Sequence, residues 1–177
     1  VFQPIKIRDD NEWLVEKKPD LIITCAYGQI IPSILLDTPK YKAINVHASL
    51  LPKLRGGAPI HWAIINGEKE TGITTFLLNH EIDKGAIIGQ QRMPILPEDN
   101  IGSMYDKLMA AGCDLVVDTV NRIASGDYTP IEQDNIDEST RVTQRALLAL
   151  LAHGIDGNHQ SQMEDAKKEL ELHLIRK

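Results

Sequence analysis

Short, almost continuously apolar runs alternate with amphipathic segments along most of the chain. Leu21–Cys25 and Ala43–His47 are apolar runs of the kind that form parallel strands covered on both faces. The amphipathic segments repeat their apolar residues at helical spacing; the longest has Asn100 or Ser103 as a candidate N-cap and Gly126 at its end. Helices are therefore predicted over Asp10–Glu16, Pro32–Leu36, Pro59–Asn66 and the segment that ends at Gly126.

Two further runs rich in strand-forming residues, Gly72–Leu78 and Ala86–Met93, are joined by the loop Asn79–Gly85. That spacing predicts an antiparallel pair. The resulting order is strand, helix, strand, helix, hairpin and helix, which is an α/β layout. Sites in such folds form at the carboxyl ends of the strands, so the residues around Cys25 and His47 are the first candidates for chemistry.

The pattern changes near Asp137, and the segment that follows predicts two helices. The first is expected over Thr143–Ala152, and the second starts at a capping box made by Ser161 and Glu164. We therefore expect one domain over residues 1–135 and a helical tail of unknown role over residues 136–177. The tail either covers exposed sheet or binds a partner.

Charge and composition restrict the partners of the chain. Its 177 residues, 42% of them apolar, suffice for one domain with a core. The net charge is −6 and no polybasic run occurs, which argues against non-specific binding to nucleic acid or membrane. No apolar run approaches the roughly 20 residues that span a bilayer. Cys25 and Cys113 lack the spacing of metal or redox pairs, and we expect buried thiols in a reducing compartment, the cytoplasm.

Asn45 and His47 lie two residues apart in a predicted strand and so project from one face. Acyl transfer to an amine passes through a tetrahedral carbon that carries an oxyanion, and the Asn45 amide can donate a hydrogen bond to it. Imidazoles titrate near neutrality, which suits His47 to the proton transfers. Asp83 can orient His47 and favour its charged form if the hairpin loop folds back over the strand end.

Each of these residues also has a plain structural interpretation. Asn45 could satisfy backbone groups at a strand end, His47 could be a partly buried imidazole with ordinary partners, and Asp83 could be a turn residue. Their joint occurrence with Ser-Leu-Leu-Pro and an Arg-Gly loop is more specific than any of them alone, and it favours a catalytic site.

Five segments resemble, in the family's order, the catalytic N-terminal domain of the folate-dependent formyltransferases. They are residues 26–32 (AYGQIIP), 44–52 (INVHASLLP), 55–60 (RGGAPI), 66–74 (NGEKETGIT) and 82–85 (IDKG). The resemblance runs from about Val1 to Gln133 and implies a Rossmann-like α/β fold. The family's first βαβ segment would precede Val1, so this domain is expected to be incomplete at its N-terminus.

The resemblance also implies roles for individual residues. Asn45, His47 and Asp83 match the family's catalytic residues, and Arg55, Gly56 and Gly57 match its substrate loop. The cofactor-binding residues are expected to be Ser49, Leu50, Leu51 and Pro52 of the tetrahydrofolate signature together with Ala26, Tyr27, Ile30 and Ile31 along the pterin pocket. The formyl donor is then 10-formyltetrahydrofolate, a tetrahydrofolate derivative.

The resemblance determines the formyl acceptor less closely than the formyl donor, because the same Arg-Gly loop occurs in family members that act on methionyl-tRNA and on amino sugars. We expect the amino group of methionyl-tRNA, formylated for translation initiation, with weak tRNA binding by this chain alone. A UDP-amino sugar is the alternative, and a non-catalytic remnant that binds folate or a partner is a third hypothesis. No metal site is predicted, since His153, Asp156 and His159 match no usual zinc spacing.

Overall fold

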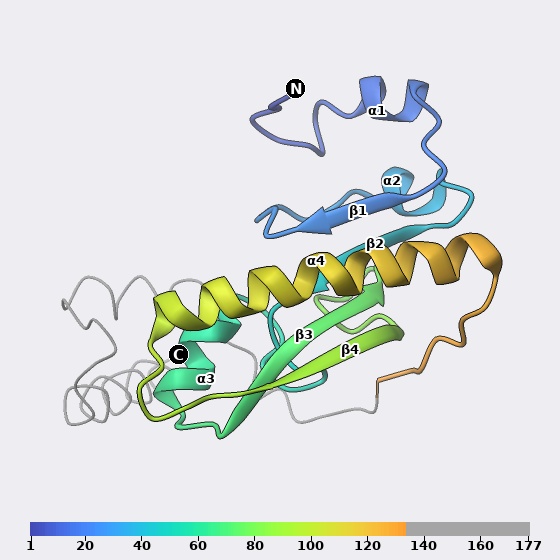
Figure 1. The fold of residues 1–177 in the computed structure, drawn as a ribbon. Coiled ribbons are helices and arrows are strands. Elements are labelled where there is room, and N and C mark those ends of the chain that lie inside the picture. Colours follow the sequence, from blue (N-terminus) through green and yellow to red (C-terminus); the bar gives the residue numbers. More distant parts are fainter. Residues whose placement is uncertain (134–177) are drawn as a thin grey trace.

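The computed structural model describes residues 1–133, which form a sheet with helices around it (Figure 1). The elements are α1 Glu12–Glu16, β1 Ile22–Cys25, α2 Ser33–Asp37, β2 Ala43–His47, α3 Pro59–Ile65, β3 Glu70–Leu77, β4 Ile87–Pro94 and α4 Ile101–Ser125. The predicted α/β class is confirmed. The helical tail and the domain boundary near residue 135 lie outside the described residues.

The sheet has the order β1-β2-β3-β4. β1 and β2 are parallel, with Thr24 opposite Asn45, whereas β3 runs antiparallel to both β2 and β4. The predicted hairpin is therefore confirmed. Because β1 and β2 are parallel, the segments that follow Cys25 and His47 leave the sheet at the same edge.

Helix α4 crosses one face of the sheet (Figure 1) and buries the predicted apolar stripe of Met104, Leu108, Ala111 and Leu115. Asn100 and Ser103 form a reciprocal capping box at its start, so both predicted caps contribute. Gly126 ends the helix at φ +75°, a conformation that favours glycine. Ile44 and Val46 of β2 belong to the core clusters beneath α4, which leaves the other face of β2 for Asn45 and His47.

Two expectations about burial are wrong. Within residues 1–133, β1 is an edge strand that is not covered on both faces, and Ile23 is 44% exposed. Cys25 and Cys113 are exposed rather than buried, because Cys25 shares the open side of β1 and Cys113 lies on the outward side of α4. Trp62 of α3 is buried in a cluster with Leu54 and Ala63. No helix among the described residues is both long and apolar enough to cross a membrane.

Candidate active site

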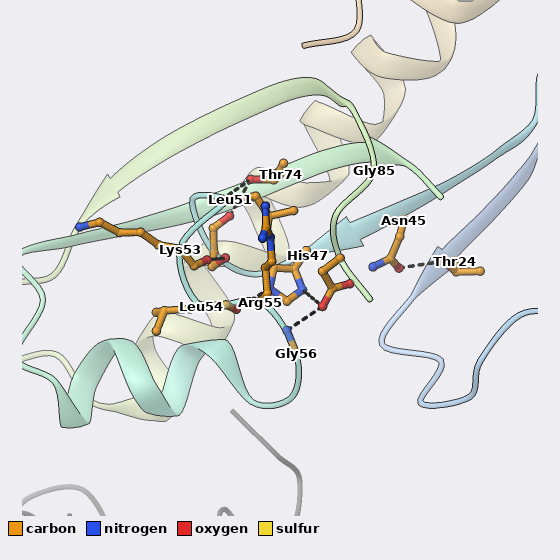
Figure 2. Close-up of polar contacts among 12 residues, drawn as sticks. Thr24, Asn45, His47, Leu51, Lys53, Leu54, Arg55, Gly56, Thr74 and Gly85 are labelled. Carbon is orange, nitrogen blue, oxygen red and sulfur yellow. Dashed lines mark hydrogen bonds and ion pairs between the residues drawn. The ribbon is translucent and has the colours of Figure 1, made fainter. Parts of the chain in front are cut away.

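The first two candidate residues lie on β2, and their neighbours explain their direction. The strand alternates between Ile44 and Val46, which pack under α4, and Asn45 and His47, which point to the opposite face. His47 is 6% exposed, whereas Asn45 is partly accessible. Figure 2 shows both side chains entering the same region from one strand.

The two ring nitrogens of His47 have different environments. Nε2 lies 2.9 Å from the Leu54 carbonyl oxygen, which can only accept, so Nε2 carries the hydrogen of this bond. Nδ1 faces the Asp83 carboxylate, with 3.6 Å between Nδ1 and Oδ2. The Leu54 contact therefore fixes the orientation of the ring, and Nδ1 is the nitrogen that is directed toward the carboxylate.

Asp83 reaches His47 because the loop between β3 and β4 folds back over β2. Its side chain is only 14% exposed, and Oδ2 also accepts a hydrogen bond of 2.8 Å from the Gly56 amide. Asp83 has φ +53°, a conformation that Asp tolerates better than most residues. Position 85 requires glycine, because a Cβ there would lie 1.6 Å from the Leu77 carbonyl oxygen. The Asp-Lys-Gly sequence thus fits both backbone requirements of the loop.

The Asn45 amide is oriented by Thr24 on the neighbouring parallel strand. The Thr24 hydroxyl donates to Asn45 Oδ1 over 2.7 Å. This bond holds the amide oxygen toward β1 and leaves the NH₂ group as the outward donor. In Figure 2 the amide nitrogen lies on the side that faces His47. The strand register places Thr24 directly opposite Asn45, which is why the bond can form.

The segment after β2 is fixed by a polar network around the buried Thr74 of β3. The Thr74 hydroxyl donates to the Ser49 carbonyl oxygen over 2.6 Å and accepts from the amide of Leu51 and the side chain of Gln90. Gln90 also donates to the Leu51 carbonyl oxygen, and the Ser49 hydroxyl donates to the Lys53 carbonyl oxygen. The Leu51–Pro52 peptide bond is cis. Ser49 and Leu51 are buried, so this candidate cofactor segment has a defined backbone shape.

The other candidate cofactor segment follows β1 and has the opposite character. Ala26 and Tyr27 are exposed, Ile30 is 80% exposed, and Ile31 is partly buried. This places accessible apolar side chains at the sheet edge from which the Ser49–Pro52 segment also leaves. Two of the predicted residues, Tyr27 and Ile30, thus present an apolar surface that a flat ring could cover.

Arg55 of the candidate substrate loop is buried rather than extended. It is 6% exposed, and its Nε and Nη2 atoms donate to Gln133 Oε1 over 3.0 and 2.8 Å. The next residue, Gly56, provides the amide that binds Asp83, and Gly57 is partly accessible. In this structure the loop therefore supports the Asp83 contact as well as bordering the site.

Charges around the hairpin loop are locally paired. Lys84 donates to Glu81 over 2.9 Å, and this bond together with the Lys84 charge lowers the pKa of Glu81. On helix α3, partial burial lowers the pKa of His61. Within residues 1–133 no three His, Cys, Asp or Glu side chains are grouped to hold a metal ion, and His153, Asp156 and His159 lie outside the described residues.

Four polar side chains that sequence reasoning did not identify shape the site: Thr24, Thr74, Gln90 and Gln133. The signal for Thr24 was its position one residue before the end of a strand predicted to be parallel to that of Asn45. Its partner followed only from the register, which the sequence does not specify. Gln133 contacts residues 78, 50 and 48 positions away in sequence, and no local pattern predicts such contacts.

Comparisons with known proteins identify the family of the chain. The sequence profile of the formyl transferase family matches residues 8–120. The chain is 49% identical over 137 residues to a methionyl-tRNA formyltransferase from Geobacillus sp. (strain WCH70), an alignment that covers 76% of this chain and 43% of the relative. The chain thus spans less than half the length of this relative.

Solved structures of formyltransferases also resemble this chain, at lower sequence identity. A sugar N-formyltransferase from Shewanella sp. FDAARGOS_354 superposes with a TM-score of 0.70 at 28% identity, covering 93% of this chain and 66% of that one. An N-formyltransferase from Helicobacter canadensis, solved in complex with folinic acid and dTDP-3-aminofucose, superposes with a TM-score of 0.56 at 28% identity, covering 66% and 44%. Fold, profile and sequence identity agree: the chain belongs to the formyl transferase family.

Proposed function

We propose that this chain carries the catalytic part of a methionyl-tRNA formyltransferase, which transfers the formyl group of 10-formyltetrahydrofolate to the amino group of methionyl-tRNA in the cytoplasm. The observation that carries the proposal is the 49% identity to the Geobacillus enzyme over the region that contains Asn45, His47 and Asp83. The direct contact between His47 and Asp83 supports it, as does the position of Asn45 on the same strand face.

The proposed reaction replaces one carbon–nitrogen bond with another. The amine nitrogen bonds to the formyl carbon, the bond from that carbon to folate N10 breaks, the amine loses a proton and N10 gains one. Negative charge develops on the formyl oxygen in between. The Asn45 NH₂ group, held outward by the Thr24 hydroxyl, is the proposed donor to this oxyanion.

His47 and Asp83 are proposed to act as one unit. Nε2 of His47 is occupied by the Leu54 carbonyl oxygen, so Nδ1 and the Asp83 carboxylate are the groups available for proton transfer. Together with the Leu54 carbonyl oxygen, the carboxylate orients the ring. It compensates the positive charge of the protonated ring, and it can accept the amine proton directly or through water. The hydrogen bond from the Gly56 amide holds the carboxylate in place for this role.

The folate is proposed to occupy the edge where β1 and β2 end. Tyr27 and Ile30 offer exposed apolar surface there, with Ala26 and Ile31 beside them, and the Ser49, Leu50, Leu51 and Pro52 segment forms the neighbouring wall. The folinic acid in the Helicobacter complex supports a folate donor for a protein of this fold. Arg55, Gly56 and Gly57 border the same region on the acceptor side.

An amino-sugar acceptor is the second candidate. It is favoured by the 93% coverage of this chain by the Shewanella sugar enzyme, although the identity to that enzyme is only 28%. The higher identity to the Geobacillus enzyme favours methionyl-tRNA. The two acceptors differ strongly in charge and size, so a direct transfer assay separates them.

The test is single-turnover formyl transfer from 10-formyltetrahydrofolate, with methionyl-tRNA or a nucleotide-linked amino sugar as acceptor. The full-length Geobacillus enzyme serves as positive control. Transfer to methionyl-tRNA alone supports the proposal, and transfer to the sugar alone contradicts it. Binding of 5-formyltetrahydrofolate without transfer to either acceptor would identify a folate-binding remnant.

A second measurement addresses the tRNA partner. A chain of net charge −6 without a basic run offers few phosphate contacts, so its dissociation constant for tRNA should be about 10⁻⁴ M or weaker at physiological salt. Sub-micromolar binding that weakens steeply with salt would contradict this expectation and would indicate a dedicated tRNA-binding surface in this chain.

A further inference from the structure

Gln133 joins three segments of the site through one side chain. Its backbone position is set two residues earlier, where Ile131 and Ile87 exchange both backbone hydrogen bonds over 2.8 Å. From there its Nε2 donates to the carbonyl oxygens of Asp83 over 2.9 Å and Gly85 over 2.7 Å. Its Oε1 accepts from both Nε and Nη2 of Arg55.

These contacts use every hydrogen-bonding position of the Gln133 amide. The NH₂ group has two hydrogens and the oxygen has two lone pairs, and each has a partner. No other natural side chain offers two donors and two acceptors in this planar arrangement, apart from the shorter Asn. The contacts therefore require this residue type, and a solvated surface glutamine would not show them.

The two donated bonds act on the turn that carries Asp83. Asp83 has φ +53°, which costs free energy unless the surroundings hold it. Gln133 holds the carbonyl of Asp83 itself and that of Gly85, one on each side of Lys84. The accepted bonds fix Arg55, whose neighbour Gly56 donates its amide to the Asp83 carboxylate. The contact that benefits is the hydrogen bond from the Gly56 amide to the Asp83 carboxylate. The NH₂ group of Gln133 stabilises its Asp83 side, and the oxygen of Gln133 stabilises its Gly56 side.

We propose that Gln133 is a positioning residue that clamps the Asp83 turn to the Arg55 loop and so keeps the Asp83 carboxylate against His47 and the Gly56 amide. Its catalytic consequence rests on the proposed function, because it acts through the His47–Asp83 pair. Whether Gln133 holds the Asp83 turn against the Arg55 loop can be tested without measuring formyl transfer.

Two variants separate the halves of the clamp. Gln133→Met keeps the length of the side chain and removes the hydrogen bonds to the Asp83 turn as well as those to Arg55. Gln133→Glu keeps an acceptor for Arg55 but places carboxylate oxygens against the carbonyls of Asp83 and Gly85, so only the turn is released. Gln91→Met, at an exposed glutamine of β4, is the matched control for the substitution itself.

The first measurement is amide hydrogen exchange at Gly56 in the full chain, read by NMR. Because this amide is bonded to the Asp83 carboxylate, its exchange should be about tenfold faster in Gln133→Met and in Gln133→Glu, and within about twofold of wild type in Gln91→Met. Unchanged exchange at Gly56 in both Gln133 variants would overturn the clamp, whether or not the chain is active.

The second measurement is formyl transfer by the same variants. Loss of carboxylate alignment should lower kcat about tenfold in Gln133→Met, with the KM for the folate within about twofold of wild type. In an Asp83→Asn background the same substitution should change kcat little, since the group it positions is already lost. Faster Gly56 exchange with unchanged kcat would overturn the positioning role. A wild-type chain that transfers no formyl group would refute the proposed function and leave the exchange result as the test of the clamp.

Discussion

The two segments that leave the sheet after β1 and β2 start at the same edge but are built in opposite ways. Residues 26–30 after β1 are all exposed, with Ile30 at 80%. After β2, by contrast, Ser49, Leu51, Leu54 and Arg55 are all buried. The first segment offers apolar side chains to the outside, whereas the second uses hydrogen bonds to hold its backbone and the ring of His47.

For the proposed function, this difference separates two demands on one site. Catalysis needs donors and acceptors that are already oriented when charge develops, and the bonds to Thr24, Leu54, Gly56 and Gln133 supply that orientation. Binding of a flat ring needs accessible apolar area, which Tyr27 and Ile30 provide at the cost of leaving it open to water. We therefore expect substitutions in the two segments to change different quantities.

The largest effect is expected at Asn45. Replacing Asn45 with Ala removes the proposed oxyanion donor, which should lower kcat by about 10²–10³-fold, or on the order of 2.7–4 kcal/mol. Folate affinity should stay similar because the exposed segment is untouched. Asn66→Ala at the exposed end of α3 is the control. A fall of less than about threefold in kcat would show that Asn45 is not the donor.

A smaller effect is expected for the network behind the buried segment, measured as stability. Thr74→Val leaves the Leu51 amide and the Ser49 carbonyl without their partner, which should lower the free energy of unfolding by about 1–3 kcal/mol. Thr71→Val on the same strand is the matched control. The Thr71 hydroxyl is buried with no hydrogen-bond partner within the described residues, so its removal should be neutral or stabilising. Equal losses in a denaturant titration would refute the network.

The exposed segment should respond through binding rather than stability. Ile30→Ser should leave the free energy of unfolding within about 0.5 kcal/mol of wild type. The same substitution should weaken 5-formyltetrahydrofolate binding about tenfold, since ligand contact would no longer bury the apolar side chain. Ile34→Ser, at a half-exposed position on α2, is the control. Calorimetry that finds equal folate affinity for both variants would place the ring elsewhere.

The smallest effect is expected on the pH dependence of stability. It arises at Asp99, which directly precedes the N-cap of α4 and lies far from the site. The hydrogen bond from Lys107, together with those from the Leu96 amide and the Ser103 hydroxyl, holds the pKa of Asp99 at about 2, below its usual 3.8. A depressed carboxyl pKa adds stability that is present above the unfolded value and is lost as pH falls toward the folded value. Melting temperatures should therefore fall less in Asp99→Asn than in wild type between about pH 4 and about pH 2. Asp114→Asn, exposed on the same helix, should behave as wild type.

Local patterns predicted the elements well and the contacts between them only in part. The hairpin and the capped helix α4 followed from strand-forming runs and cap residues, which act over a few positions. The burial of Cys25 was mispredicted because an apolar run does not reveal whether a neighbouring strand covers it. Asn45, His47 and Asp83 were predicted from motif and spacing, whereas Thr24 and Gln133 depend on strand register and on a contact across 50 residues or more.

The most direct test of the account is a double-mutant cycle on kcat/KM for formyl transfer with His47→Ala and Asp83→Asn. Because the carboxylate is proposed to act through the ring that it faces at 3.6 Å, the double variant should be no more than about threefold worse than the poorer single variant. Losses that multiply fully would contradict the account, since they would mean that His47 and Asp83 contribute independently.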